Sequence, residues 1–186
     1  MKVLIIPEDQ TQDGYIAKPV IEALLNDEGI PARVDVLPEP RLRGAGDALD
    51  PELVREIVDE YPMIDLFVLV VDRDCDRQGH EAKAAAREQE HAGRLVACVA
   101  IQELEVWLLA LHKDKLDARW PEIRNECDPK ERWAEPLLKR IGTSGPGGGR
   151  KKAMQALKGQ LQSLVSLCDE LQQLKGKLAV ARNKNA

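Results

Sequence analysis

Three aspartates, Asp72, Asp74 and Asp76, stand within five residues directly after the apolar run LFVLVV. Carboxylates so close together repel one another, and in a partly dry crevice at an effective dielectric constant of about 20 this repulsion costs several kcal/mol. The repulsion is relieved when one carboxylate takes up a proton or when a cation binds between them. The spacing of these residues therefore predicts a raised carboxyl pKa or a site for a divalent cation.

Further acidic residues follow other apolar runs. Glu8 comes directly after KVLIIP, and Glu103 and Glu105 follow RLVACVAI. The carboxyl ends of parallel strands meet at one edge of a sheet, where open α/β sheets bind their ligands. We therefore expect Glu8, Asp72 and Asp74 to converge there as metal ligands. Because these donors are all oxygen atoms and no cluster of His or Cys accompanies them, Mg²⁺ or Mn²⁺ is predicted rather than zinc.

Strand and helix patterns alternate along residues 1–112. Continuous apolar runs, which are typical of strands covered on both faces, alternate with segments of helical spacing. This alternation predicts an α/β fold with one parallel sheet of about four strands and helices on both faces. The expected strands are residues 2–7, 30–38, 64–71 and 94–101, and the expected helices are residues 15–29, 50–61, 79–93 and 102–116.

The second part of the chain differs in charge. Residues 113–186 carry 16 Lys/Arg against 9 Asp/Glu, whereas residues 1–112 carry 11 against 23, and the formal net charge of the whole chain is −5. Helical segments interrupted by prolines lead to a glycine-rich loop at residues 142–149, and one long helix, packed on the sheet, is expected from Met154 onward. We expect an α/β domain over residues 1–112 and a basic helical extension over residues 113–186.

Arg150, Lys151 and Lys152 begin a helix directly after the glycine-rich loop. Backbone N–H groups and cationic side chains in such a position can both meet phosphate, so these residues are predicted to contact the backbone of a nucleic acid, DNA or RNA. A solvated linker is the alternative interpretation. The loop does not have the spacing of a P-loop, so any ATPase would be a separate protein.

The four cysteines, Cys75, Cys98, Cys127 and Cys168, lie far apart and form no CxxC pair. We expect reduced thiols that mostly fill the core. No apolar stretch approaches the roughly 18 residues of a membrane span, and the N-terminus does not have the layout of a signal peptide. A cytoplasmic protein without a membrane partner is therefore expected, and the oligomeric state, including a homodimer, stays open.

Two of these motifs together are similar to those of a known family. An acid after the first strand, here Glu8, and a DxD motif after a middle strand, here Asp72–Asp74, resemble the TOPRIM domain of topoisomerases, primases and OLD-family nucleases. The run EVWLL, which begins at Glu105, is similar to a motif of the small stand-alone RloB-like TOPRIM proteins, found in bacterial defence cassettes beside an ATPase. The resemblance covers about residues 1–112.

The resemblance implies roles for these residues. Glu8 would be a metal ligand or a general acid/base, and Asp72 and Asp74 would hold Mg²⁺. Glu105 would complete the acidic pocket. The implied activity is Mg²⁺-dependent hydrolysis of phosphodiester bonds in nucleic acid, in antiviral defence together with a separate ATPase of the ABC or AAA type. The family usually has glycine where this chain has Asp9, and the segment DQTQDGY that begins there is longer than usual, so the roles of Asp9 and Asp13 stay open.

Three other classes stay open. A haloacid-dehalogenase-type phosphohydrolase also places DxD after an apolar strand, with the first Asp as nucleophile and the second as acid. A receiver domain would use Glu8 and Asp72 in its acidic pocket, although the fourth predicted strand does not end in Ser or Thr. A non-catalytic regulatory subunit of an ATPase complex is the third class.

Overall fold

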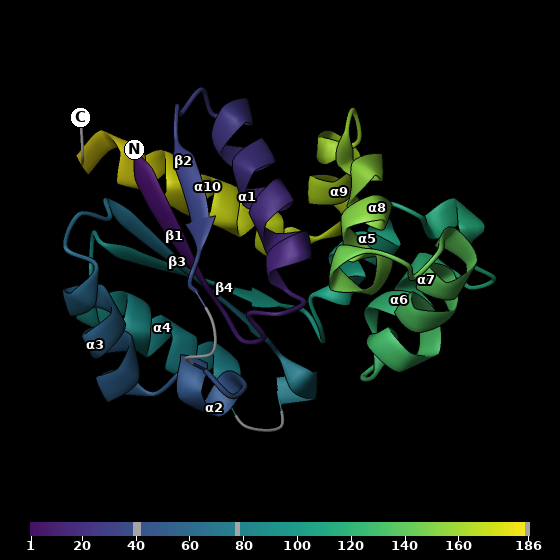
Figure 1. The fold of residues 1–186 in the computed structure, drawn as a ribbon, viewed down its shortest axis with the longest axis horizontal. Coiled ribbons are helices and arrows are strands. Elements are labelled where there is room, and N and C mark those ends of the chain that lie inside the picture. Colours follow the sequence, from purple (N-terminus) through teal and green to yellow (C-terminus); the bar gives the residue numbers. More distant parts are fainter. Residues whose placement is uncertain (39–41, 77–78, 185–186) are drawn as a thin grey trace.

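Four parallel strands form one sheet in the order β2-β1-β3-β4 (Figure 1). The structure is a computed structural model that describes residues 1–38, 42–76 and 79–184. The predicted α/β fold with a parallel sheet of about four strands is confirmed. The strands are β1 (Lys2–Pro7), β2 (Arg33–Val36), β3 (Leu66–Asp72) and β4 (Leu95–Ala100).

Helices cover both faces of the sheet, with α1 and α10 on one face and α2, α3 and α4 on the other (Figure 1). In β1, Val3 and Ile5 belong to the core beneath α1 and α10, whereas Leu4 and Ile6 belong to the core beneath α3 and α4. Successive side chains of a strand point to opposite faces, so a continuous apolar run buries both faces. The helices are α1 (Gly14–Asp27), α2 (Ala45–Ala48), α3 (Pro51–Glu60), α4 (His80–Glu90) and α10 (Asp169–Lys184).

The strand order determines where the sheet opens a crevice. β1 lies between β2 and β3, so the chain leaves β1 in one direction to form β2 and later returns to form β3 on its other side. Such a reversal opens a crevice at the carboxyl ends of the strands that flank it. These strands are β1 and β3, whose ladder pairs Pro7 with Val70. Glu8 and Asp72 therefore lie at the crevice.

A group of short helices lies beside one end of the sheet (Figure 1). The last helix, α10, leaves this group and packs on β4 and α1. The buried carboxylate of Glu170 in α10 accepts hydrogen bonds from Trp107 Nε1 at 2.8 Å and from an Arg124 guanidinium nitrogen at 3.0 Å, which ties α10 to the group. The group comprises α5 (Glu105–Ala110), α6 (Trp120–Arg124), α7 (Glu135–Ile141), α8 (Arg150–Ala153) and α9 (Leu161–Leu167).

Within the described residues, none of the helices has the length and hydropathy needed to span a membrane.

The single long helix predicted from Met154 onward is wrong, although its last part packs on the sheet as expected. The chain instead forms a 3₁₀ turn that ends at Leu157, then α9, and then α10. The first break includes Gly159, whose φ of +79° is a left-handed conformation. Glycine adopts this conformation without the steric cost that a Cβ atom brings. The apolar spacing thus predicts the buried face but not the break in the helix.

Basic side chains of α10 pair with acidic side chains of the α/β domain. Lys175 forms an ion pair with Asp27, and Lys177 forms one with Glu88 at 2.7 Å. The hydrogen bond between Lys175 and Asp27 lowers the pKa of the aspartate and raises the pKa of the lysine. Part of the basic surplus of the extension therefore compensates the acidic surplus of the α/β domain within the molecule.

Alanine is expected to have opposite effects at Gly159 and Gly176. At Gly159 the positive φ makes alanine unfavourable by about 1 kcal/mol. Gly176 is exposed inside α10, and no atom lies within 4 Å of an added Cβ. Alanine at Gly176 should therefore raise the free energy of unfolding by about 0.5 to 1 kcal/mol. Urea denaturation measures both variants, and a stabilised Gly159→Ala protein would contradict the break.

Candidate metal centre

Three carboxylates converge at the carboxyl edge of the sheet. Asp72 ends β3, Asp74 follows it, and Glu103 lies in the loop between β4 and α5. One oxygen atom from each carboxylate lies within 4.8 Å of the other two, and all three residues are partly exposed. We call Asp72, Asp74 and Glu103 the acidic triad.

The chemistry of the acidic triad fits a hard divalent cation. Its donors are all carboxylate oxygens, the ligands that Mg²⁺ and Mn²⁺ prefer. Oxygen ligands of one magnesium ion lie about 3 to 4 Å apart, so the observed spacing within 4.8 Å needs only a small contraction. The sequence predicts Asp72 and Asp74 as ligands together with Glu8, whereas the group that the described residues bring within 4.8 Å contains Asp72, Asp74 and Glu103.

Glu8 lies at the same edge and contacts the loop of the triad. Its carboxylate accepts a hydrogen bond from the backbone N–H of Asp72 at 3.2 Å, and its own N–H donates to the carbonyl oxygen of Val70 at 3.2 Å. Burial raises the pKa of Glu8, and the charge of Asp74 raises it further, although the hydrogen bond from Asp72 acts in the opposite direction. Glu8 is therefore placed to hold a proton beside the triad.

Groups outside the triad orient it. Asp72 Oδ1 accepts a hydrogen bond from the N–H of Leu104 at 2.8 Å, and Glu103 Oε2 accepts one from the N–H of Lys130 at 2.7 Å. Nδ1 of the buried His80 lies 2.7 Å from the carbonyl oxygen of Asp72. Contacts of this kind fix the direction in which a metal ligand points. The triad is thus held partly by the extension, to which Lys130 belongs.

Backbone strain is concentrated in the same loops. Among the described residues other than glycine, positive φ angles occur at Asp74 (+50°), Cys75 (+56°) and Gln102 (+68°). The N–H of Asp74 donates to the carbonyl oxygen of Gln102, and the N–H of Cys75 donates to the side-chain oxygen of Gln102, each at 3.0 Å. Such conformations cost about 1 to 3 kcal/mol each and persist only where the surroundings hold them.

The crevice holds several carboxyl groups with raised pKa values. Burial raises the pKa of Asp72 well above its usual value, and the charges of Asp13, Glu8 and Glu105 add to this effect. The pKa of Asp13 is raised to about 7, mainly by burial and to a smaller extent by the charge of Glu105. Burial also raises the pKa of Glu103 to about 7. Near neutral pH the crevice therefore takes up protons or binds a cation.

The sequence assigns no role to Asp13, Glu103 or His80. Asp13 directly precedes α1, and its carboxylate accepts a hydrogen bond from the N–H of Asp9 at 2.9 Å. Its place at a helix start, shortly after Glu8, is the signal that could have indicated it. Glu103 has the same signal as Glu105, because both follow the fourth strand. No sequence pattern indicates His80.

Glu105 and Arg150 form a buried ion pair. Their side chains are 3% and 6% exposed, and Arg150 Nε lies 3.2 Å from Glu105 Oε1. Arg150, a predicted phosphate contact, is therefore enclosed against the residue that was expected to complete the acidic pocket. Lys151 and Lys152 are exposed, and Nζ of Lys152 donates a hydrogen bond to the carbonyl oxygen of Ile141 at 2.7 Å.

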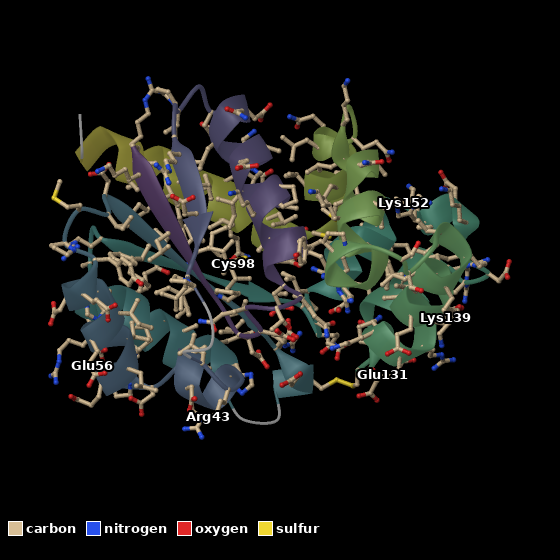
Figure 2. All side chains as sticks on the ribbon, viewed as in Figure 1. Arg43, Glu56, Cys98, Glu131, Lys139 and Lys152 are labelled. Carbon is tan, nitrogen blue, oxygen red and sulfur yellow. A yellow bond between two sulfur atoms is a disulfide. The ribbon has the colours of Figure 1, made fainter. Side chains whose placement is uncertain are left out.

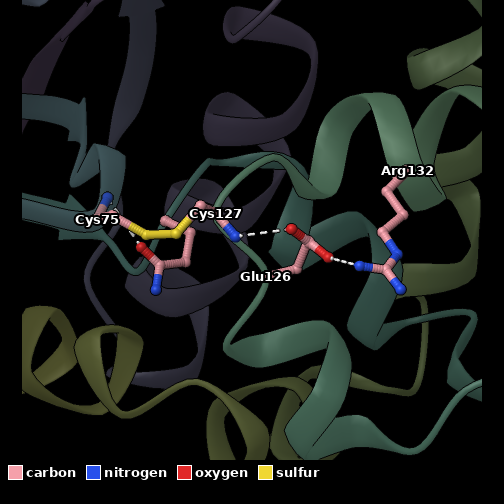
Figure 3. Close-up of a disulfide and its surroundings, with 5 residues drawn as sticks. Cys75, Glu126, Cys127 and Arg132 are labelled. Carbon is pink, nitrogen blue, oxygen red and sulfur yellow. Dashed lines mark hydrogen bonds and ion pairs between the residues drawn. A yellow bond between two sulfur atoms is a disulfide. The ribbon is translucent and has the colours of Figure 1, made fainter.

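The prediction that all four cysteines are reduced thiols is wrong. Cys75, next to Asp74, forms a disulfide with Cys127 (Figure 3). These cysteines are 52 residues apart in sequence, and the fold brings their Cα atoms to 5.6 Å, a distance that no spacing rule predicts. Cys98 and Cys168 are free and buried, and burial raises the pKa of both thiols. These two agree with the expected core-filling role.

No protein-family model, curated protein or solved structure matches this chain. The fold and the site define an α/β protein with an acidic cluster at the switch point of a parallel sheet. The resemblance to TOPRIM domains stays a prediction that rests on Glu8, Asp72–Asp74 and Glu105.

The raised pKa of Asp13 predicts how stability depends on pH without divalent cations. The carboxyl group keeps its proton in the folded protein up to about pH 7, whereas in the unfolded chain it ionises above about pH 4. The folded state then binds more protons, so the free energy of unfolding falls as pH rises from about 4 to about 7. In the Asp13→Asn variant, the decrease in the free energy of unfolding over this pH range should be smaller than in the wild type by roughly 2 to 4 kcal/mol.

Urea denaturation in EDTA at pH 5 and pH 7.5 measures this effect. The exposed Asp59 of α3 provides a matched control, because Asp59→Asn should leave the fall unchanged. If the Asp13→Asn variant loses as much stability as the wild type, the Asp13 carboxyl does not titrate with a raised pKa.

Arg150→Ala should strongly destabilise the protein, because it leaves the buried Glu105 carboxylate without its partner. Loss of one member of a buried ion pair costs about 3 to 5 kcal/mol. Lys151→Ala, in the same helix but exposed, should change the free energy of unfolding by less than about 0.5 kcal/mol. Urea denaturation compares the two variants, and equal effects would contradict the buried pair. The double variant Glu105→Gln/Arg150→Met should recover much of the loss.

Proposed function

We propose that this protein hydrolyses phosphodiester bonds of nucleic acid with Mg²⁺ or Mn²⁺ held by the acidic triad. The observation that carries the proposal is the convergence of Asp72, Asp74 and Glu103 within 4.8 Å. They meet at the carboxyl edge of a parallel sheet with the strand order β2-β1-β3-β4, which is where such sheets bind ligands. The raised pKa values around the triad support the same proposal, because a cation would relieve the repulsion.

Asp72, Asp74 and Glu103 would hold the ion. A divalent cation lowers the pKa of a bound water and stabilises negative charge on a phosphate group. The chain's own residues orient the carboxylates through the backbone N–H groups of Leu104 and Lys130. Burial raises the pKa of Glu8, so its carboxyl group holds a proton more readily than an exposed glutamate does, which suits a general acid/base beside the triad.

A polyanionic substrate also needs positive charge near an acidic site. Burial lowers the pKa of Lys130, but the charges of the nearby carboxylates, with Glu105 the largest, together outweigh this effect, so the pKa is raised and Lys130 stays cationic. Lys151 and Lys152 are exposed and suit contacts to further phosphates of the backbone. In this proposal Arg150 acts through its ion pair with Glu105 and does not contact the substrate.

The proposal includes a separate ATPase of the ABC or AAA type and a cytoplasmic role in antiviral defence. This part is supported by the resemblance to stand-alone TOPRIM proteins. The glycine-rich segment also supports it: Pro146–Gly149 is a turn at which Gly147 packs on Tyr15, since an added Cβ would lie 2.4 Å from that ring. A segment packed against a side chain in this way does not cradle a nucleotide.

Purified protein should cleave plasmid, single-stranded DNA or tRNA in Mg²⁺ or Mn²⁺ but not in EDTA. The double variant Asp72→Asn/Glu103→Gln removes metal-binding charge without removing core volume, and its cleavage rate should fall by about 100-fold or more. Glu56→Gln changes an exposed carboxylate on α3 (Figure 2) and should keep full activity. Saturating Mn²⁺ should raise the melting temperature by about 5 °C in the wild type and in Glu56→Gln, but not in the double variant.

The two readouts separate the parts of the proposal. Cleavage by the double variant at the wild-type rate would place the chemistry elsewhere. A melting shift without cleavage of any of the three substrates would support the metal centre and contradict the hydrolysis.

A further inference from the structure

The disulfide between Cys75 and Cys127 joins the two sides of the acidic triad. Cys75 directly follows the triad residue Asp74. Cys127 lies three residues before Lys130, whose N–H donates to the triad residue Glu103 at 2.7 Å. One covalent bond therefore connects the loop after β3 with the segment of the extension that orients Glu103.

The two cysteines of the disulfide are more exposed than the two free cysteines. Cys75 and Cys127 are both partly exposed, whereas Cys98 and Cys168 are buried. Beside the disulfide, the carboxylate of Glu126 accepts a hydrogen bond from the N–H of Cys127 at 3.1 Å and forms an ion pair with Arg132 (Figure 3). The extension side of the bond is thus held by contacts of Glu126, whereas the loop side contains the two residues with positive φ angles, Asp74 and Cys75.

The loop that contains Cys75 needs restraints to keep its conformation. Asp74 and Cys75 have φ angles of +50° and +56°, which L side chains rarely adopt. The disulfide and two hydrogen bonds to Gln102, one to its carbonyl oxygen and one to its side-chain oxygen, help to hold the loop in this conformation. When the disulfide opens, its covalent restraint on the strained loop is lost, and Asp74 is expected to relax away from Asp72 and Glu103.

We propose that the Cys75–Cys127 disulfide is a redox-controlled latch on the acidic triad, so that the oxidised protein binds a divalent cation tightly and the reduced protein binds it weakly. This inference rests on the proposed metal centre. It also fits the proposed cytoplasmic location, because disulfides in that compartment are usually transient, catalytic or redox-sensing.

The latch opens by thiol–disulfide exchange with a dithiol reductant. A thiolate of the reductant attacks one sulfur of the disulfide and forms a mixed disulfide, while the other cysteine leaves as a thiolate and takes up a proton. The second thiol of the reductant then displaces the remaining cysteine. Cys75 and Cys127 together gain two electrons and two protons, and the reductant leaves as a disulfide.

The test is Mn²⁺ binding to the full chain, measured by isothermal titration calorimetry in the oxidised state and after reduction with dithiothreitol and removal of the reductant. The dissociation constant for Mn²⁺ should rise by about tenfold on reduction, a typical effect of losing a group that orients a metal ligand. Cys75→Ser/Cys127→Ser should bind as weakly as the reduced wild type and should not respond to dithiothreitol. Thiol counting in denaturant should find two thiols before reduction and four after it.

Each other result contradicts the latch in a different way. Equal Mn²⁺ affinity in both redox states would overturn the latch and leave the metal centre standing, whereas no binding to the oxidised protein would contradict both. Four free thiols after treatment with oxidised glutathione would show that the bond does not form. Loss of the helical circular dichroism signal on reduction would make the disulfide a general staple of the fold and overturn a local latch.

Discussion

Negative charge confined at the carboxyl ends of β1 and β3 is the constraint on which the rest of the structure depends. Burial raises the pKa of Glu8, Asp13 and Asp72, so each of these groups is harder to ionise here than in water. The chain compensates part of this charge with backbone hydrogen bonds and with Arg150, which pairs with Glu105. The remaining charge is partly exposed in the acidic triad, where a cation can compensate it.

The extension is therefore a part of the site rather than an addition to the α/β domain. It supplies Arg150 to Glu105 and the backbone N–H of Lys130 to Glu103. It also supplies Cys127, which is bonded to the loop of the triad. Some basic residues of the extension therefore compensate the charge of the acidic domain within the molecule, and others, such as Lys151 and Lys152, remain exposed.

The fold could be predicted from the sequence because its signals are local. Buried parallel strands give continuous apolar runs, and aspartate favours the N-cap position that Asp50 takes at α3, where its carboxylate accepts from two backbone N–H groups. The edge of the sheet where the acids meet follows from the same signals. The membership of the acidic triad cannot be predicted from these signals. It depends on the positive φ angles of Asp74 and Gln102, which these residue types do not require. The long-range pairs, Glu105 with Arg150 and Cys75 with Cys127, likewise depend on tertiary packing that has no local pattern.

The central claim is that the acidic triad is a cation site, and anomalous diffraction from crystals soaked in Mn²⁺ tests it most directly. The predicted result is a strong anomalous peak within about 2.5 Å of a carboxylate oxygen of Asp72, Asp74 and Glu103. Crystals of the Asp72→Asn/Glu103→Gln variant should lack this peak. Wild-type crystals with ordered triad side chains and no peak between them at saturating Mn²⁺ would contradict the account.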